Sequence, residues 1–505
     1  MTTTSTDRFD PVEATVDDVR TAISDERITA EALVKRYLER IDAYDDDLNA
    51  ILTVNDDALR RARRLDARFA DEGPVGPLHG VPVILKDNQD THDMPTTAGS
   101  VALAEARPAR DAFIVERLRE AGAIVLAKAN LQELSFGVDT ISSLGGETRN
   151  AYDLDRRPSG SSGGTAAAVA ANMATIGTGT DTCSSVRSPP AFNALVGVRP
   201  TRGLVSRTGI VPLSDTQDTA GPIARTVADA ARMLDVMAGY DPEDPVTARG
   251  ADAVPDDGYV SHLDPDGLED ARIGILREWF GLQDETAAPK ADAAAVTTVL
   301  EDAIADLRAA GATVVDPVEV VDGDTLRSAR VVGFEFVREF DRYLAEHGGE
   351  IPYESLRELY ETGSIAPAVA SRIDDAGILD GDGESLDRNV DYLRRLQRRQ
   401  RLENAVLARF VEEDLDAVMY PPSTVPPVER PDHQPFSELP CELAAHTGLP
   451  AIVVPAGSTD DGLPVGMELL GRRFAEPRLF EVAYSYEQAT DHRRPPERFG
   501  DLEAS

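Results

Sequence analysis

The stretch VPVILKDN, residues 81–88, begins as an apolar run that indicates a buried β-strand and ends on a lysine. Lysine is rare here, because only four of the 51 basic residues are Lys, at positions 35, 86, 128 and 290. A guanidinium stays charged, whereas a desolvated amine can lose its proton near neutral pH and act as a base. Lys86 is therefore a candidate general base, and the alternative is a strand-end lysine paired with Asp87.

The bulk composition excludes several classes of protein. No apolar run approaches the ~20 residues that a membrane span needs, so no membrane partner is expected. The segment MTTTSTDRFDPVEATVDD is polar and acidic and has no secretory h-region, so a cytoplasmic location is the default. The net charge of −39 predicts a highly acidic surface, like that of proteins from salt-rich cytoplasms, and disfavours a nucleic-acid partner.

The cysteines are too few to define a site. Cys183 and Cys441 give neither a disulfide framework nor a metal-ligand spacing. We therefore expect no structural disulfide, no metal and no other cofactor.

Helical and strand patterns alternate along the chain, which predicts an α/β/α layered fold with a mixed central β-sheet. Helices are expected through most of 12–70, including one continuous helix from Ile28 to Leu52. Strands at both ends of the chain can join one sheet, so residues 1–505 are interpreted as one domain. Within it, 75–240 carries the core motifs, 240–440 is a variable substrate-pocket region, and 441–490 supplies closing strands and a helix.

The segment RPSGSSGGTAAAVA, residues 157–170, is compatible with three structures. Its serines and glycines suit a loop that caps the alanine-rich helix after it. A phosphate-binding loop is disfavoured, because neither GK[ST] nor GxGxxG is present. The pattern G-x-S-x-G would suit an α/β-hydrolase using Ser162 with His433 or His446. However, the polar DLDRRPSG stands where that turn needs an apolar strand.

The segment GTGTDTCSSVRSPPAF, residues 177–192, indicates a glycine-rich turn after a strand. Successive N–H groups in such a turn can stabilise a developing oxyanion, and a serine at its end can be a nucleophile. Such a segment is more often an ordinary turn that leads into a helix. Taken alone, it does not decide between a structural turn and a catalytic one.

Several ordered motifs together resemble the amidase signature family of serine hydrolases. They are GPLHGVPVILKDNQDTHDMPTTAGS, PSGSSGGTAAAVAA, GTDTCSSVRSPPAFNALVGVRPTRGLVSRTGIVPL, QDTAGPIARTVADA, and the C-terminal GLPAIVVPAG and GLPVGMELLGRRFAEPRL. The resemblance covers nearly the whole chain and is weakest between about 240 and 440. It implies the amidase signature fold and an amidase that cleaves a carboxylic amide to the acid and ammonia or an amine.

The resemblance implies a Ser–cis-Ser–Lys triad without histidine. Lys86 matches the family's lysine, and Ser161 matches the relay serine that follows a cis peptide bond. Ser185, 24 positions after Ser161, matches the nucleophile. In this mechanism Ser161 relays the proton of Ser185 to a neutral Lys86, and water hydrolyses the acyl-enzyme on Ser185.

The oxyanion is expected to contact backbone N–H groups of Thr182, Cys183 and Ser184. The family usually has two glycines where this chain has Cys183 and Ser184, and the added side chains narrow the permitted backbone angles. Neither residue is proline, so both donors remain. The 24-residue spacing selects Ser185 as the nucleophile over Cys183 and over Ser184, its nearest rival.

Three other positions belong to the same comparison. Ser159 replaces the usual first glycine of the SSGG loop. Asp181 and Arg187 match family positions and are expected to brace the turn. His79 is expected to be structural.

Two alternative functions remain open at this point. One is the A subunit of the glutamine-dependent aminoacyl-tRNA amidotransferase, which works with a partner subunit; the CSS turn and QDT, where the common form is LDT, differ from it. The other is a non-catalytic relative, because the glycine pair is lost. The expected partner is a small-molecule amide. A homodimer is left open, and the sequence does not identify the amide.

Overall fold

The structure is a computed structural model that describes residues 9–281, 289–347, 351–380, 385–435 and 438–502. Its strands are β1 (Ile51–Val54), β2 (Pro82–Lys86), β3 (Ile124–Ala129), β4 (Ile141–Ser142), β5 (Gly146–Glu147), β6 (Ile176–Asp181), β7 (Val196–Arg199), β8 (Thr219–Ala224), β9 (Arg272–Ile275), β10 (Thr313–Val315), β11 (Ala417–Tyr420), β12 (Ala451–Ser458) and β13 (Pro464–Leu470).

The α-helices follow the same numbering from the N-terminus. They are α1 (Val16–Ser24), α2 (Ala30–Leu48), α3 (Ala58–Glu72), α4 (Phe113–Glu120), α5 (Gly163–Ala170), α6 (Ser188–Phe192), α7 (Val227–Met237), α8 (Lys290–Ala309), α9 (Gly323–Arg327), α10 (Val332–His347), α11 (Leu356–Glu361), α12 (Pro367–Asp375), α13 (Val390–Glu412), α14 (Glu438–Thr447) and α15 (Glu476–Thr490).

A mixed eleven-stranded sheet runs through the molecule in the order β1-β3-β2-β6-β8-β7-β12-β13-β11-β9-β10. Strand β2 is parallel to both β3 and β6. From β6 to β11 neighbouring strands are antiparallel, and β11, β9 and β10 are again parallel. Strands β2 and β6 are buried along their whole length, so residues at their ends lie in the interior.

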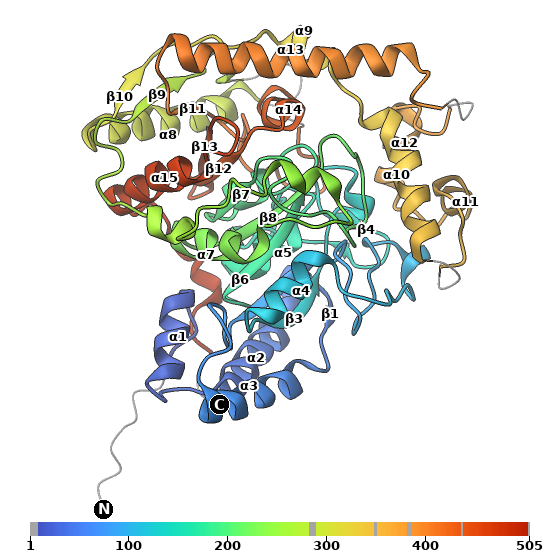
Figure 1. The fold of residues 1–505 in the computed structure, drawn as a ribbon, viewed down its shortest axis with the longest axis vertical. Helices are drawn as coiled ribbons and strands as arrows, with labels where there is room; N and C mark the ends of the chain where they lie inside the picture. The colour runs from blue at the N-terminus through green and yellow to red at the C-terminus, as the bar shows by residue number, and fades with distance from the viewer. Residues whose placement is uncertain (1–8, 282–288, 348–350, 381–384, 436–437, 503–505) are drawn as a thin grey trace, which may run out of the picture.

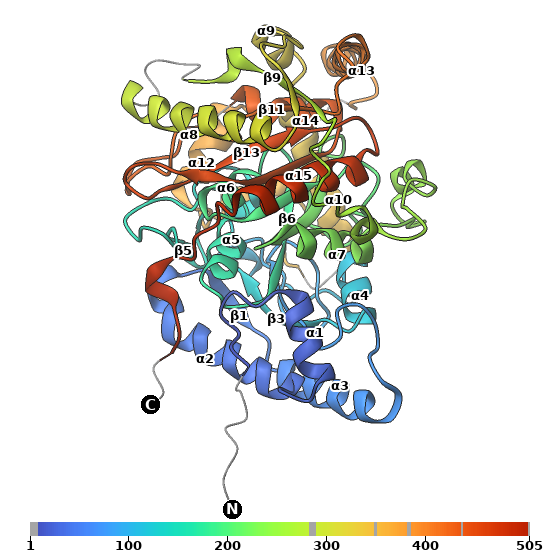
Figure 2. The ribbon, with the colours of Figure 1, turned by 90° about the vertical axis from the view of Figure 1, so that its left-hand side faces the viewer.

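Helices cover this sheet in two groups. Helices α5 and α6 pack on its central strands and on each other, while α7, α8 and α15 form a second set against β7, β8, β10, β12 and β13. Helices α1 to α3 lie at the end of the molecule that carries β1, and α13 crosses the opposite end (Figures 1 and 2). Helices α10 to α12 form a lobe beside the sheet (Figure 1). The α/β/α expectation is confirmed.

The expected helix from Ile28 to Leu52 is too long. Helix α2 ends at Leu48, the next residue Asn49 adopts a left-handed conformation with φ +52°, and β1 begins at Ile51. Asparagine tolerates this conformation better than most residues, which explains why the apolar periodicity continues past the real end of the helix.

No helix in the described ranges combines the length and the apolar character that crossing a bilayer requires. The sheet takes β1 to β3 from the first third of the chain and β11 to β13 from its last fifth. We propose on this basis that the chain forms a single domain.

The close approach of β7 and β8 provides a test of the sheet. A Cβ atom on Gly221 would lie 1.9 Å from the carbonyl oxygen of Val198. Since that atom is backbone in a paired strand, Gly221→Ala should lower the free energy of unfolding by about 3 kcal/mol or more. Thermal unfolding followed by circular dichroism measures the effect.

Gly500→Ala is the matched control, because a Cβ there meets nothing within 4 Å. Its unfolding temperature should match that of the wild type. If Gly221→Ala also unfolded at the wild-type temperature, the described spacing of β7 and β8 would be wrong.

Candidate active site

Lys86 is the last residue of β2, and its side chain is fully buried. Its Nζ lies 2.7 Å from Ser161 Oγ and 2.7 Å from Thr180 Oγ1. Asn88 Nδ2 donates to the same Thr180 hydroxyl at 2.9 Å. Strand β6 supplies Thr180, so the parallel pairing of β2 and β6 brings the amine and these hydroxyls together.

A second buried lysine in this fold has a different kind of partner. Lys128 on β3 is also fully buried, and its Nζ lies 2.9 Å from Asp87 Oδ1. It donates further to the Pro95 carbonyl at 3.0 Å. Asp87 therefore pairs with Lys128, so the alternative of a Lys86–Asp87 pair is wrong. Within the described residues, the hydrogen-bond partners of Lys86 Nζ are both hydroxyl groups.

This environment changes the acid–base behaviour of Lys86. Burial lowers its pKa from the usual 10.5 to about 7, although the charges of Asp181 and Asp218 partly oppose the shift. Removing an ammonium group from water disfavours its charged form, which is the cause of the lowering. A large fraction of Lys86 is thus neutral at physiological pH.

The loop that carries Ser161 is held tightly by its neighbours. The Gly160–Ser161 peptide bond is cis, as the resemblance implies. The Ser161 carbonyl accepts a hydrogen bond from the Gln132 N–H at 3.0 Å. Thr140 Oγ1 donates to the Ser159 carbonyl at 2.6 Å and accepts from the Gly163 N–H at 3.2 Å.

A single carboxylate organises the turn after β6. Asp181 is fully buried and accepts hydrogen bonds from the N–H groups of Ser184 at 2.9 Å and Val186 at 3.0 Å. Arg187 Nε lies 3.1 Å from it, and Arg199 Nη1 lies 2.5 Å from it. Burial alone would raise the pKa of Asp181, but the two guanidinium groups hold it well below its usual value.

The expected oxyanion residues fall into two groups. The Ser184 N–H already donates to Asp181. Among the residues that the structure describes, the N–H groups of Cys183 and Ser185 donate no hydrogen bond. Both Ser184 (φ +84°) and Ser159 (φ +64°) adopt left-handed backbone angles that favour glycine. These are two of the positions at which the resemblance implies glycine.

Ser185 lies at the end of this turn and is almost fully buried. Across the described ranges, its Oγ makes no hydrogen bond to Ser161 Oγ, whose side-chain partner is Lys86. The structure thus joins Lys86 to Ser161, while Ser185 lies on the adjacent turn without that contact. Hydrogen bonds of catalytic groups are often long before a substrate binds.

Ser185 opens into a cavity of about 560 Å³. Its apolar wall consists of Phe136, Val138, Leu213, Val332, Phe334 and Ile378. Arg330 and Glu442, which pair with each other, and Arg372 add charged groups to the lining. The wall therefore combines residues from 240–440 with residues of the core motifs. A second cavity, of about 680 Å³, reaches Asn88 and Thr180, the hydroxyl beside Lys86.

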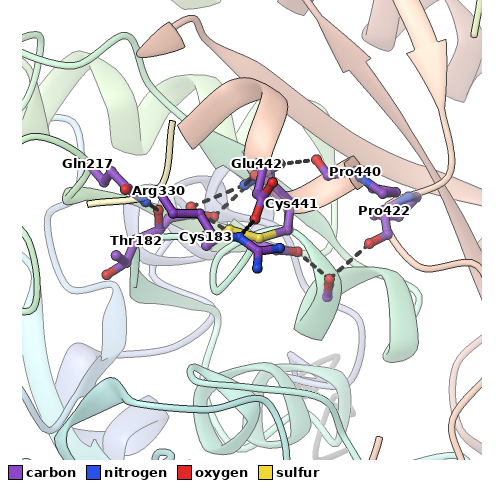
Figure 3. The surroundings of a disulfide bond; sticks show 12 residues. Thr182, Cys183, Gln217, Arg330, Pro422, Pro440, Cys441 and Glu442 are labelled. Atoms are coloured by element: carbon purple, nitrogen blue, oxygen red, sulfur yellow. Dashed lines mark hydrogen bonds and ion pairs between the residues drawn. A yellow bond between two sulfur atoms is a disulfide. The ribbon is translucent and has the colours of Figure 1, made fainter. Parts of the chain in front are cut away.

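The expectation of no disulfide is wrong. Cys183 and Cys441 are bonded, with a Cα–Cα distance of 5.0 Å at a sequence separation of 258 residues (Figure 3). Pairing at such a separation depends on where α14 docks, and the sequence pattern did not predict this helix. Thr180 was also missed, although a threonine inside a fully buried strand is a polar signal.

The α/β-hydrolase alternative does not match the geometry. Ser162 Oγ donates to the Thr180 carbonyl at 3.4 Å. His433 Nδ1 lies 2.7 Å from Asp139, and His446 is buried in a site that lowers its pKa well below the usual value. Neither histidine hydrogen-bonds Ser162 in the described parts of the chain. His79 is buried and accepts from the Val75 N–H at 3.2 Å, which suits a structural residue.

One group of side chains in the described residues has the spacing of metal ligands, namely His92, Asp93 and Asp111. Arg119 lies 2.7 Å from Asp93 and 3.0 Å from Asp111. The guanidinium already pairs with both carboxylates, and none of these residues belongs to the candidate active site.

Comparisons with known proteins show the family of the chain. The family model described as Amidase matches residues 32–480, and the chain belongs to the Amidase family. This family membership defines the chain as an amidase, a hydrolase of amide carbon–nitrogen bonds.

The similar proteins cover almost the entire chain. The structure of peptide amidase from Stenotrophomonas maltophilia has a TM-score of 0.85 and 37% identity, covering 96% of this chain and 98% of that one. A probable amidase of Arabidopsis thaliana is 36% identical over 97% of this chain and 92% of the relative. The A subunit of glutamyl-tRNA(Gln) amidotransferase from Moorella thermoacetica is 35% identical over 96% of this chain and 98% of the relative.

The pKa of Lys86 leads to a prediction about stability. Between about pH 7 and pH 10.5 the unfolded chain carries a proton on Lys86 that the folded chain has lost, so this group makes folding more favourable as the pH rises. Lys86→Met removes that contribution. The stability of the wild type relative to Lys86→Met should therefore increase with pH across this window, by at most about 1.4 kcal/mol per pH unit.

Unfolding temperatures of both proteins, measured at several pH values in this window, test the prediction. Lys35→Met is the control for losing a lysine, because the Lys35 side chain is exposed; it should keep the wild-type pH dependence. Parallel curves for wild type and Lys86→Met would contradict the lowered pKa.

Proposed function

We propose that this amidase hydrolyses a carboxylic amide through an acyl-enzyme on Ser185, with Ser161 and Lys86 moving the proton. One observation carries the proposal: a fully buried lysine with a pKa of about 7 lies 2.7 Å from the hydroxyl of Ser161. A neutral amine beside a hydroxyl can accept its proton, which a lysine held in an ion pair cannot do.

In the proposed reaction Ser185 Oγ attacks the amide carbonyl carbon. Its proton passes to Ser161 Oγ while the Ser161 proton passes to Lys86 Nζ. When the tetrahedral intermediate collapses, the C–N bond breaks and the same route returns a proton to the leaving nitrogen. Water then attacks the acyl-enzyme, and the acid is released from Ser185. Ser185 must approach Ser161 for this transfer, which we expect when a substrate fills the cavity.

Charge that develops on the carbonyl oxygen needs hydrogen-bond donors. We propose the N–H groups of Cys183 and Ser185 for this role, because both lie on the turn and neither donates to a described residue. Thr182 remains a further expected donor. Ser184 serves instead as a brace, because its N–H donates to Asp181. Donors fixed before the reaction lower the barrier without reorganisation.

The cavity beside Ser185 suits an amide whose acyl part is largely apolar. Its wall of aromatic and aliphatic side chains also carries charged groups, including Arg330 and Arg372, that can contact polar parts of a substrate. A peptide amidase, whose structure in complex with the competitive inhibitor chymostatin has a TM-score of 0.85 to this chain, supports a small peptide-like amide as the substrate class. We further propose a cytoplasmic enzyme whose acidic surface suits high salt, given the net charge of −39.

A second candidate is the amidotransferase function, because subunits of that enzyme match this chain at 35% identity, close to the 36% of the probable amidase. The two functions differ in their need for a partner. Turnover of a simple amide by the isolated chain, measured as ammonia release, favours the stand-alone amidase. Activity that appears only with a partner subunit would favour the amidotransferase.

Substitution of the triad tests the mechanism. Ser185→Ala removes the nucleophile, so kcat for amide hydrolysis should fall by at least about 10³-fold and labelling by a fluorophosphonate probe should disappear. Lys86→Met removes the base and should lower kcat by about 10²- to 10⁴-fold.

Lys35→Met, an exposed substitution, is the control and should retain wild-type activity and labelling. A Ser185→Ala protein that is still labelled would move the nucleophile elsewhere, with Ser184 as the first position to examine. Absence of labelling in the wild type would support a non-catalytic relative.

The pH dependence of turnover tests the base directly. Because only the neutral amine can accept the proton, kcat/KM should rise with pH and level off above an apparent pKa near 7, the value to which burial lowers Lys86. The residual activity of Lys86→Met should not show this rise of kcat/KM with pH. A wild-type profile that is flat from about pH 6 to about pH 9 would argue against Lys86 as the base.

A further inference from the structure

The Cys183–Cys441 disulfide lies at the centre of the candidate site. Cys183 is two residues before Ser185, in the turn after β6, and Cys441 lies on α14. Cys441 is buried, whereas Cys183 is partly exposed and lines the same cavity as Ser185. The disulfide thus forms part of the wall that a bound substrate would touch.

The disulfide also connects the turn to the charged part of the cavity. Glu442, the residue after Cys441, pairs with Arg330, and both side chains line the cavity (Figure 3). On the other side, Gln217 Nε2 donates to the Thr182 carbonyl at 3.0 Å. The turn is therefore attached to its surroundings on both sides of Cys183.

Other contacts of the turn hold the peptide groups on either side of Cys183 and leave its side chain to the disulfide. Asp181 holds the N–H groups of Ser184 and Val186. Arg187 Nη2 donates to the Cys441 carbonyl at 3.2 Å, which keeps α14 docked independently of the sulfur atoms. The side chain of Cys183 has the disulfide as its attachment, so cutting this bond frees the side chain of the residue that carries a proposed oxyanion donor.

We propose that the Cys183–Cys441 disulfide is a redox-sensitive positioning element: together with the hydrogen bonds at Thr182 and Ser184 it fixes the Cys183 N–H for the oxyanion, and a small dithiol that enters through the cavity switches the site to a less active form. This inference rests on the proposed function. It assigns to the disulfide the restraint of the turn at Cys183, where the family resemblance implies a glycine.

The chemical step is an ordinary thiol–disulfide exchange. A dithiol attacks the sulfur of Cys183, the S–S bond breaks, and the Cys441 sulfur leaves and takes up a proton. The second thiol of the reductant then displaces Cys183, which is released as a thiol. The protein gains two electrons and two protons, and the reductant becomes a cyclic disulfide.

The test uses a readout that needs no knowledge of the natural substrate. The rate at which a fluorophosphonate probe labels Ser185 should fall by about tenfold or more when dithiothreitol reduces the wild-type protein, and it should recover on reoxidation with oxidised glutathione. Cys441→Ser should label at the reduced rate with or without dithiothreitol. Circular dichroism of the reduced protein checks that the fold is retained.

Two outcomes would separate the inference from the function it rests on. If a thiol assay shows complete reduction but the labelling rate does not change, the inference is wrong and the amidase proposal is unaffected. No labelling of the oxidised wild type would instead overturn the proposed function.

A second measurement holds even if Cys441→Ser does not fold. In a Ser185→Ala protein, which cannot turn over, saturating phenylacetamide should slow reduction by dithiothreitol by about tenfold, because a bound amide covers Cys183. Alkylation with iodoacetamide after brief reduction should modify Cys183 faster than Cys441. Reduction at the same rate with and without phenylacetamide, together with faster alkylation of Cys441, would contradict a disulfide in the cavity wall.

Discussion

The buried carboxylate of Asp181 is the interaction on which the active-site turn depends. It receives two backbone N–H groups of the turn and the guanidinium groups of Arg187 and Arg199. Arg187 in turn lies 2.5 Å from Glu468 on β13, which also accepts from the Tyr420 hydroxyl at 2.7 Å. A buried charge is tolerable only when it is paired and hydrogen-bonded, so this network specifies one arrangement of the turn.

The same network affects the protonation of the proposed base. A negative charge near an amine favours its protonated form, and Asp181 does raise the pKa of Lys86 against the effect of burial. Arg187 and Arg199 offset that negative charge, because both lie within ion-pair distance of Asp181. The groups that hold the turn of the proposed nucleophile thus also limit how far the pKa of Lys86 is raised by Asp181.

The two buried lysines show why the sequence alone could predict only part of the candidate site. Scarcity of lysine and its place at a strand end identified Lys86, but the same argument applies to Lys128 at the end of AIVLAK. Only the fold distinguishes them, since Lys128 reaches Asp87 and Lys86 reaches two hydroxyls. The family resemblance supplied the pairing of Lys86 with Ser161, which lies 75 positions away.

Other features could not be predicted because they depend on long-range docking. The disulfide requires α14 to meet the turn after β6, and neither cysteine has a neighbouring motif that indicates a partner. The α/β/α fold, by contrast, follows from local periodicity, which survives in the sequence.

The partners of Arg187 have a consequence for the order in which the enzyme is made. All three proposed triad residues are translated before residue 186, yet Glu468 and Cys441 emerge from the ribosome much later. Until those C-terminal strands and α14 dock, the nascent chain carries an unbalanced arginine and an unanchored turn. We therefore expect no amide hydrolysis from a nascent chain that ends before residue 468.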